Sequence, residues 1–205
     1  FGTSFEGKNI VMTVGAAGGL NVILKSLINP GDEVIVFAPY FGEYRSYTSN
    51  YDGVLVEISP DTDTFQPKLN EFEQKITPKT KAVIVNTPNN PTGVVYSEET
   101  IQKMAAIMEA KQKEYGTEIY LISDEPYREL VYDGVEVPYL TKYYANTVVG
   151  YSYSKSLSLP GERIGYLVIP DEVADSEDLR SAANVATRIL GFVNAPTLQQ
   201  KVVAK

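Results

Sequence analysis

Residues 147–165 read TVVGYSYSKSLSLPGERIG: an apolar run, a lysine, a Pro-Gly turn and the start of a second apolar run. The β-branched composition of residues 147–151 and 164–169 predicts two buried strands. Lys155 follows the first of these strands closely, and Pro160-Gly161 then turns the chain toward the second. A lysine just beyond the end of a buried strand lies where open α/β sheets bind their ligands.

The same pattern recurs along the whole chain. Short β-branched runs alternate with amphipathic stretches, which is typical of parallel strands joined by helices. We therefore predict an α/β fold in three layers, α/β/α, with a mainly parallel, mixed sheet. The predicted strands are residues 33–37, 54–58, 81–85, 118–122, 147–151 and 164–169.

The clearest predicted helix begins after Ser97. Ser97 is a good N-cap, and Glu98 and Glu99 fall in the first turn, where the helix dipole favours negative charge. Gly116 is a typical helix terminator. A second helix is predicted over residues 20–27. The first helix should place one apolar face on the sheet, formed by Ile101, Met104, Ala105 and Met108.

The composition excludes several classes of function. The chain has 205 residues, 43% of them hydrophobic, and a formal net charge of -8 without a basic stripe, so we expect one domain that does not bind nucleic acid. Cys and His are absent, so no disulfide, thiolate nucleophile or metal site is expected. No apolar run approaches the roughly 18 residues that span a bilayer, and a cytoplasmic protein is expected. Because the chain opens at Phe1 and stops at Lys205 within a helix-like segment, we read it as a fragment.

Unusual polar segments follow three of the predicted strands. The carboxyl ends of parallel strands lie at one edge of a sheet, and ligands bind in the crevice beyond them. We therefore expect the three segments to form one site. They are residues 86–92, 124–127 and 152–155.

Lys155 and Arg163 have an ordinary interpretation when each is considered alone. Most lysines of this kind are solvated at the surface, and most arginines of this kind are partners in surface ion pairs. The functional alternative is an imine-forming lysine, which reacts through its neutral amine and is favoured by a nearby positive charge such as Arg163. The surrounding motifs decide between these two readings.

Ser152, Lys155 and Arg163 are spaced as S-x-x-K and K-x-x-x-x-P-G-x-R-x-G, which resembles the cofactor-lysine motif of the class I and II aminotransferases. The resemblance is to the fold type I, aspartate aminotransferase-like enzymes, and it extends from Thr13 to about Pro196. It implies pyridoxal 5'-phosphate as the cofactor. Lys155 would be the Schiff-base lysine and the proton shuttle at the substrate α carbon, while Ser152 and Arg163 would bind the cofactor phosphate, whose oxygens match the fork of an arginine.

A second motif, residues 86–93, reads NTPNNPTG and is similar to the N-x-P-N-N-P-T-G loop of the same family. Asn, Pro, Thr and Gly are turn formers, so a plain turn is the alternative for a shorter match. The resemblance implies that Asn86 and Asn90 contact the cofactor. Asn90 would form a hydrogen bond with its phenolic oxygen.

A third motif, residues 122–127, reads ISDEPY and resembles the D-E-x-Y segment of the family. The resemblance implies that Asp124 pairs with the protonated pyridine nitrogen and that Tyr127 donates to the phenolic oxygen. A carboxylate in that position keeps the nitrogen protonated, so the ring can accept electron density from the substrate. Taken alone, Asp124 would be a strand-end carboxylate that caps the next turn.

A fourth motif, residues 13–20, reads TVGAAGGL and forms a Gly-rich entry to a helix. Such an entry points backbone N–H groups at an anion, although close helix packing also favours glycine. The resemblance implies that Gly15, Ala16 and Ala17 cradle the phosphate. The family commonly has a hydroxyl residue where Ala17 stands, so we expect somewhat weaker phosphate binding here.

The last motif is Ala38-Pro39-Tyr40, which follows the predicted strand 33–37. It is similar to the A-P-x-Y or A-P-Y segment of the family, whose aromatic ring stacks on the pyridine. The resemblance implies that role for Tyr40. An aromatic residue at a strand end otherwise belongs more often to the core or its rim.

The resemblance implies an enzyme that moves an amino group between an aspartate- or alanine-type amino acid and a 2-oxo acid. Lyases and decarboxylases use the same scaffold, and aminotransferase-like sensor domains occur in transcription regulators, so these stay as alternatives. Residues 1–205 would form the pyridoxal-phosphate-binding large domain of a homodimer. On this reading, an amino-terminal segment and a carboxyl-terminal small domain of the family pattern would be missing from it.

Overall fold

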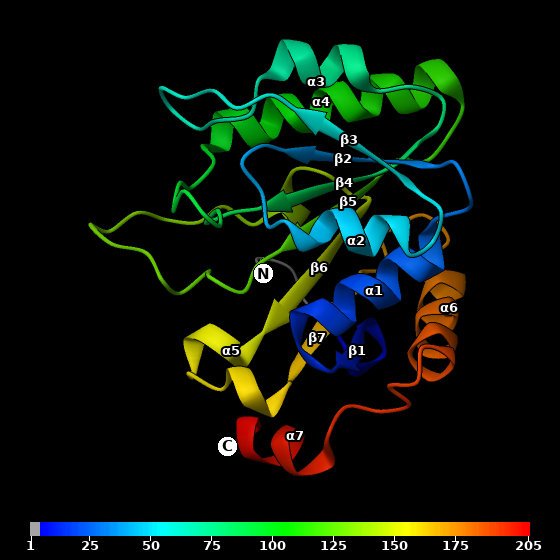
Figure 1. The fold of residues 1–205 in the computed structure, drawn as a ribbon, viewed down its shortest axis with the longest axis vertical. Helices are drawn as coiled ribbons and strands as arrows, with labels where there is room; N and C mark the ends of the chain where they lie inside the picture. Colours follow the sequence, from blue (N-terminus) through cyan, green and yellow to red (C-terminus); the bar gives the residue numbers. More distant parts are fainter. Residues whose placement is uncertain (1–4) are drawn as a thin grey trace.

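The computed structural model describes residues 5–205 and shows one seven-stranded sheet with the strand order β1-β7-β6-β5-β4-β2-β3 (Figure 1). The pairs β2–β3, β2–β4, β4–β5 and β5–β6 are parallel, whereas β7 runs antiparallel to both β6 and β1. The strands are β1 (Ile10–Thr13), β2 (Glu33–Phe37), β3 (Val54–Ile58), β4 (Thr80–Asn86), β5 (Tyr120–Asp124), β6 (Thr147–Ser152) and β7 (Gly165–Val168).

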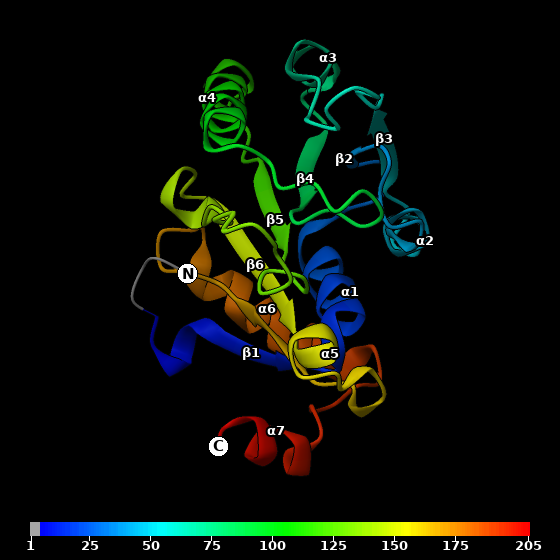
Figure 2. The same cartoon turned by 90° about the vertical axis from the view of Figure 1, so that its left-hand side faces the viewer.

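Helices cover both faces of the sheet (Figure 2). α1, α2 and α6 lie on one face, and α3 and α4 lie on the other. The helices are α1 (Gly15–Leu27), α2 (Glu43–Ser49), α3 (Leu69–Lys75), α4 (Glu98–Tyr115), α5 (Tyr153–Ser156), α6 (Ser176–Ile189) and α7 (Thr197–Val203), with 3-10 turns η1 (Gly7–Asn9), η2 (Leu140–Lys142) and η3 (Pro160–Glu162). The predicted three-layer α/β/α arrangement with a mainly parallel sheet is confirmed.

The alternation of side chains along each central strand explains why both faces are covered. In β2, Val34 and Val36 join the core beneath α1, whereas Ile35 and Phe37 join the core beneath α3 and α4. Both sets are apolar because successive residues of a strand point to opposite faces. A strand with apolar side chains on both faces therefore requires a helical layer on each side.

Most predicted boundaries agree with the structure. The strands over residues 33–37 and 54–58 match β2 and β3, and Ser97 caps α4 by accepting a hydrogen bond from the Thr100 amide, with Gly116 at the other end. All four residues predicted for the buried face of α4 are buried. α1 begins at Gly15, five residues before the predicted residue 20.

Strand β1 was not predicted. It has four residues, and its identity as a strand comes from pairing with β7, which lies more than 150 residues later in the chain. Such a short run carries no periodicity of its own.

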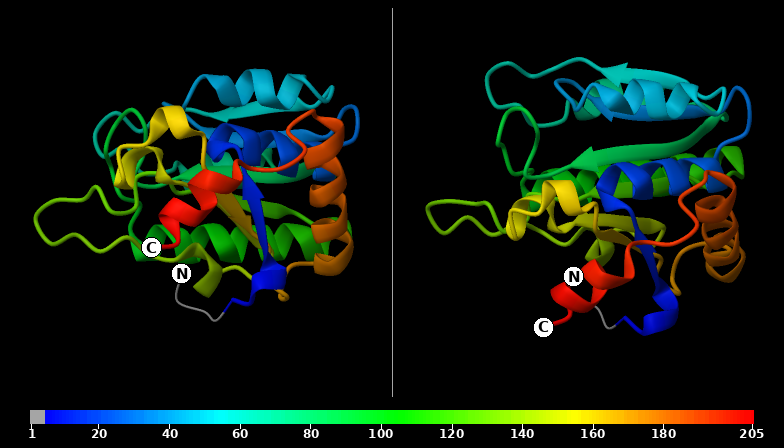
Figure 3. Two further views of the ribbon diagram at one scale, coloured as in Figure 1. Left: turned by 90° about the horizontal axis from the view of Figure 1, so that it is seen from below. Right: turned by 60° about the horizontal axis from the view of Figure 1, so that its bottom comes forward.

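Figure 3 shows a further feature that the pattern did not predict, the long connection between β5 and η2 that reaches away from the sheet. Within residues 5–205, no helix combines the length and the apolar character needed to cross a membrane.

Candidate active site

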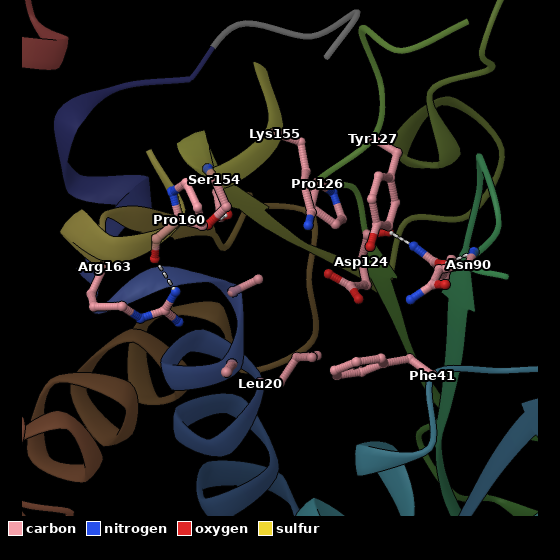
Figure 4. A pocket seen from close by; sticks show the side chains of 14 residues that line it. Leu20, Phe41, Asn90, Asp124, Pro126, Tyr127, Ser154, Lys155, Pro160 and Arg163 are labelled. Atoms are coloured by element: carbon pink, nitrogen blue, oxygen red, sulfur yellow. Dashed lines mark hydrogen bonds between the residues drawn. The ribbon is translucent and has the colours of Figure 1, made fainter. Parts of the chain in front are cut away.

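A cavity of about 190 Å³ opens beyond the carboxyl ends of the central strands (Figure 4). Segments from the α1 entry, the β2–α2 connection, and the ends of β4, β5 and β6 meet there, because their strands are neighbours in the sheet. Its lining includes most of the residues predicted from the sequence. The cavity is lined by Ala16, Ala17, Leu20, Phe41, Asn86, Asn90, Asp124, Pro126, Tyr127, Ser152, Ser154, Lys155, Pro160 and Arg163.

Two predicted site residues do not line this cavity, and one of them faces elsewhere. The Tyr40 ring stacks on the Tyr44 ring at 6.3 Å between centroids, and its hydroxyl donates to Glu57 at 2.7 Å. These contacts hold the Tyr40 ring at the side of the turn that faces α2 and β3. Phe41, the next residue, is the aromatic side chain from this turn that lines the cavity. The other residue, Gly15, is buried at the start of α1 next to the Arg163 guanidinium.

Lys155 reaches the cavity from the short helix α5. Ser152 ends β6 and caps α5, because its Oγ accepts a hydrogen bond from the Ser154 amide at 3.1 Å. This cap turns the chain directly from the strand into the helix that carries Lys155. The Lys155 ammonium nitrogen lies 5.7 Å from the centroid of the Tyr127 ring, and both side chains point into the cavity in Figure 4.

Asp124 is the last residue of β5 and is 5% exposed. Its Oδ2 accepts a hydrogen bond of 2.6 Å from the Tyr44 hydroxyl, whereas its buried Oδ1 has no hydrogen-bond partner in the described structure. Burial raises the pKa of the Asp124 carboxyl to about 6, the Tyr44 hydrogen bond acts in the opposite direction, and the charge of Glu125 raises the pKa further. A buried carboxylate oxygen without a donor is costly, so the site is suited to a ligand that supplies one.

Asn86, Asn90 and Tyr127 connect the ends of two neighbouring strands. The Asn86 amide donates to the backbone carbonyl of Asp124 at 2.8 Å, and its Oδ1 accepts the Asn90 backbone N–H at 2.6 Å. The Asn90 side chain donates to the Tyr127 hydroxyl (Figure 4). Asn86 therefore holds the two loops together, while Asn90 and Tyr127 direct their polar atoms to the same point of the cavity.

The N-terminus of α1 and Arg163 form another end of the cavity. Ala16 and Ala17 lie in the first turn of α1, where backbone N–H groups are free for an anion. The Arg163 guanidinium donates to the Pro160 carbonyl at 2.7 Å, and its other amino group lies 3.5 Å from the Val14 carbonyl. Ser152 and Ser154 add hydroxyl groups to this end, and their Oγ atoms are 2.8 Å apart.

Two glycines allow this end of the cavity to close. Gly15 has φ +77°, and a Cβ at this position would lie 2.6 Å from Nη2 of Arg163. A Cβ at Gly165 would lie 2.4 Å from the Tyr151 carbonyl oxygen and 3.1 Å from the Gly15 carbonyl carbon. Any side chain at either position would separate the α1 entry from Arg163 or from the β6–β7 pair. Gly15 thus serves the site through close approach and does not line the cavity.

Sequence reasoning missed Phe41, Tyr44 and Ser154. Phe41 lies next to Tyr40 in the sequence, and residue type alone does not decide which of these two aromatic side chains faces the cavity. Ser154 is present in the quoted lysine motif but has no separate role in it. Tyr44 gives no signal in the sequence, because its contact with Asp124 joins residues 80 positions apart.

Comparisons with known proteins identify the family of the chain. The family model for aminotransferase class I and II matches residues 2–205. A probable aspartate/prephenate aminotransferase of Thermus aquaticus is 37% identical over 81% of this chain and 42% of its own length, and an aspartate aminotransferase of Pyrococcus horikoshii is 32% identical over 94% and 48%. The crystal structure of an aminotransferase from Eubacterium rectale superposes with a TM-score of 0.98 at 52% identity, over 100% of this chain and 52% of that one. The chain thus spans about half the length of these relatives, and it belongs to the class I and II aminotransferase family.

Proposed function

We propose that the protein is a pyridoxal-phosphate-dependent aminotransferase that exchanges an amino group between an amino acid and a 2-oxo acid. The observation that carries the proposal is the buried Oδ1 of Asp124, which has no hydrogen-bond donor among residues 5–205 and lies at the same cavity that Lys155 enters. A protonated pyridine nitrogen would donate to that oxygen. It would also compensate the buried negative charge, which is otherwise unfavourable.

The residues present fit the other parts of the cofactor. Arg163, Ser152 and the first amides of α1 would hold the phosphate through charged and backbone hydrogen bonds. Asn90 and Tyr127 would donate to the phenolic oxygen. Phe41, in place of Tyr40, would contact the ring, since it is the aromatic residue of that turn that lines the cavity.

When bound, the cofactor supplies an electron sink for the bond that breaks at the substrate α carbon. Asp124 would maintain that sink by holding a proton on the ring nitrogen. Lys155 Nζ would take the proton from the α carbon of the amino acid and later return one, acting as general base and then as general acid. Arg163 and the other lining residues would hold the cofactor and the substrate in a fixed orientation. A fixed orientation of the reacting groups lowers the barrier of the proton transfer.

Three wider assignments remain proposals of the same kind. We propose that residues 1–205 form the cofactor-binding large domain, and that the substrates are aspartate- or alanine-type amino acids with their 2-oxo acids. We also propose a homodimer, because enzymes of this family complete each site with residues of the neighbouring subunit; sedimentation of an active monomer would contradict this. A cytoplasmic location stays a prediction.

A half-reaction tests the proposed chemistry in the intact protein. After loading with pyridoxal phosphate, a panel of amino acids should convert the bound aldehyde form to the amine form, seen as a change in the absorption spectrum. Adding a 2-oxo acid should then restore the aldehyde form. A lyase would release ammonia while the cofactor returned to the aldehyde form without a 2-oxo acid, and this result would contradict the proposal.

A further inference from the structure

Tyr44 is a buried side chain that directly contacts Asp124 but does not line the cavity. It lies in α2, is 1% exposed, and donates its hydroxyl to Asp124 Oδ2 at 2.6 Å. Its ring is packed between Tyr40, stacked at 6.3 Å, and Phe41, edge-on at 5.7 Å. Because the ring is held on both sides, the hydroxyl has one position available to it.

The two oxygens of the Asp124 carboxylate therefore differ. Within residues 5–205, the Tyr44 hydroxyl makes the only hydrogen bond to this carboxylate, and it occupies Oδ2 alone. The terminal torsion of an aspartate is broad, so a carboxylate with no partner could turn either oxygen, or both, toward the cavity. The hydrogen bond from Tyr44 selects one orientation and leaves Oδ1 for a ligand.

We propose that Tyr44 is a positioning residue, which holds Asp124 so that Oδ1 faces the ring nitrogen of the bound cofactor and keeps the carboxylate ionised. The inference rests on the proposed function for the identity of the ligand. The orientation and ionisation of Asp124 can be measured without that ligand. Tyr44 acts through Asp124 and does not touch the reacting atoms.

The groups around Asp124 show why one hydroxyl matters. Burial and the Glu125 carboxylate both raise the pKa of Asp124, and the Tyr44 hydrogen bond lowers it. Burial is the main cause of the raised pKa values of Tyr127 and Tyr47, and the charge of Asp124 raises both further, so both neighbouring hydroxyls are neutral near pH 7. The cations that line the cavity are Lys155 and Arg163. Removing the Tyr44 hydroxyl would leave the buried Asp124 carboxylate without a hydrogen bond from residues 5–205.

The test compares Tyr44→Phe with Tyr144→Phe in the intact protein. Tyr144 is an equally buried tyrosine, 2% exposed, whose hydroxyl donates to the Ile119 carbonyl at 2.7 Å near the other end of β5. Both variants lose one buried hydroxyl and one short hydrogen bond, but only Tyr44→Phe affects the Asp124 carboxylate. Tyr144→Phe thus controls for a general loss of stability.

The first measurement uses the cofactor-free protein with ¹³C-labelled aspartate side chains, titrated by NMR and assigned with Asp124→Asn. Loss of a hydrogen bond to a charged group should raise the pKa of Asp124 by roughly one unit or more in Tyr44→Phe. Tyr144→Phe should leave it unchanged. An unchanged Asp124 titration in Tyr44→Phe overturns the inference, whether or not the protein binds pyridoxal phosphate.

The second measurement is the apparent dissociation constant of pyridoxal phosphate across a pH series. If the pKa of Asp124 rises by one unit from about 6, Tyr44→Phe should weaken binding by up to about tenfold below pH 6 and by only about twofold at pH 7, and the loss should vanish as the pH rises further. Failure of the unsubstituted protein to bind pyridoxal phosphate would count against the proposed function alone. Binding by Tyr44→Phe equal to that by Tyr144→Phe would overturn the role of Tyr44.

A shape-preserving variant covers the case in which Tyr44→Phe does not fold. Replacing Tyr44 by 3-fluorotyrosine makes its hydroxyl a stronger donor with little change in size. The hydrogen bond to Asp124 should then strengthen, and the pKa of Asp124 should fall, opposite to the change in Tyr44→Phe. An Asp124 titration that does not respond to the fluorine substitution overturns the inference.

Discussion

A methyl group added at Gly15 should weaken cofactor binding by displacing Arg163. In Gly15→Ala the new Cβ would lie 2.6 Å from Nη2 of the guanidinium, which is closer than real Cβ atoms approach, and 3.0 Å from its Cζ. The guanidinium must therefore move away from the α1 entry. If that removes one charged hydrogen bond to the phosphate, about 1.5–3 kcal/mol is lost, or about 10- to 150-fold in affinity.

Gly31→Ala provides the matched control. Gly31 also has a positive φ, +87°, but a Cβ there would meet nothing within 4 Å. Both substitutions carry backbone strain of roughly 1–2 kcal/mol, offset in part by about 0.4–1 kcal/mol from the stiffer unfolded chain. The two variants should therefore have similar melting temperatures while differing in affinity.

The assay is a titration of the cofactor-free intact protein with pyridoxal phosphate, repeated with inorganic phosphate as competitor. Gly15→Ala should bind both molecules more weakly than Gly31→Ala. Affinities within twofold of each other would refute the account, because the Arg163 position would then not matter for the phosphate. A weaker affinity for pyridoxal phosphate with unchanged phosphate competition would place the damage elsewhere in the cavity.

Three further outcomes are expected. The Asp124 carboxyl has a pKa of about 6 in the folded protein against 3.8 for the free group, so the folded, cofactor-free protein holds an extra proton between about pH 4 and 6. Its stability should fall as the pH rises through that window, by at most roughly 3 kcal/mol, and Asp124→Asn should flatten this slope in urea unfolding curves. Ala17→Ser should restore a hydroxyl at the α1 entry and tighten pyridoxal phosphate binding several-fold; no gain would show that this position is not at the phosphate. Phe41→Ala should weaken binding more than Tyr40→Ala in the same titration, and the reverse order would return the ring-contact role to Tyr40.

The elements that could be predicted are those whose pattern is local. β2 and β3 each contain three β-branched residues out of five, and Ser97 with Gly116 marks both ends of α4 by cap chemistry alone. β1 could not be predicted in the same way, because four residues become an edge strand only through the backbone of β7. Local propensity is weak where pairing with a distant segment decides the structure.

The residues of the candidate site also differ in whether a local sequence pattern or a tertiary contact places them. Residues with a motif, such as Lys155 and Asn90, could be predicted from the sequence, and the cavity brings them together. The choice between Tyr40 and Phe41 depends on how the turn after β2 rotates, which residue types do not reveal. The role of Tyr44 depends on α2 packing over the end of β5, a contact that exists only in the folded protein.

The proposed function requires that Lys155 carries pyridoxal phosphate covalently. Reducing the loaded intact protein with borohydride fixes the cofactor to its lysine, and peptide mapping by mass spectrometry then locates the label. One labelled peptide is expected, with the modification on Lys155, and no label is expected in Lys155→Ala treated in the same way. A label on another lysine, or equal labelling of Lys155→Ala, would contradict it.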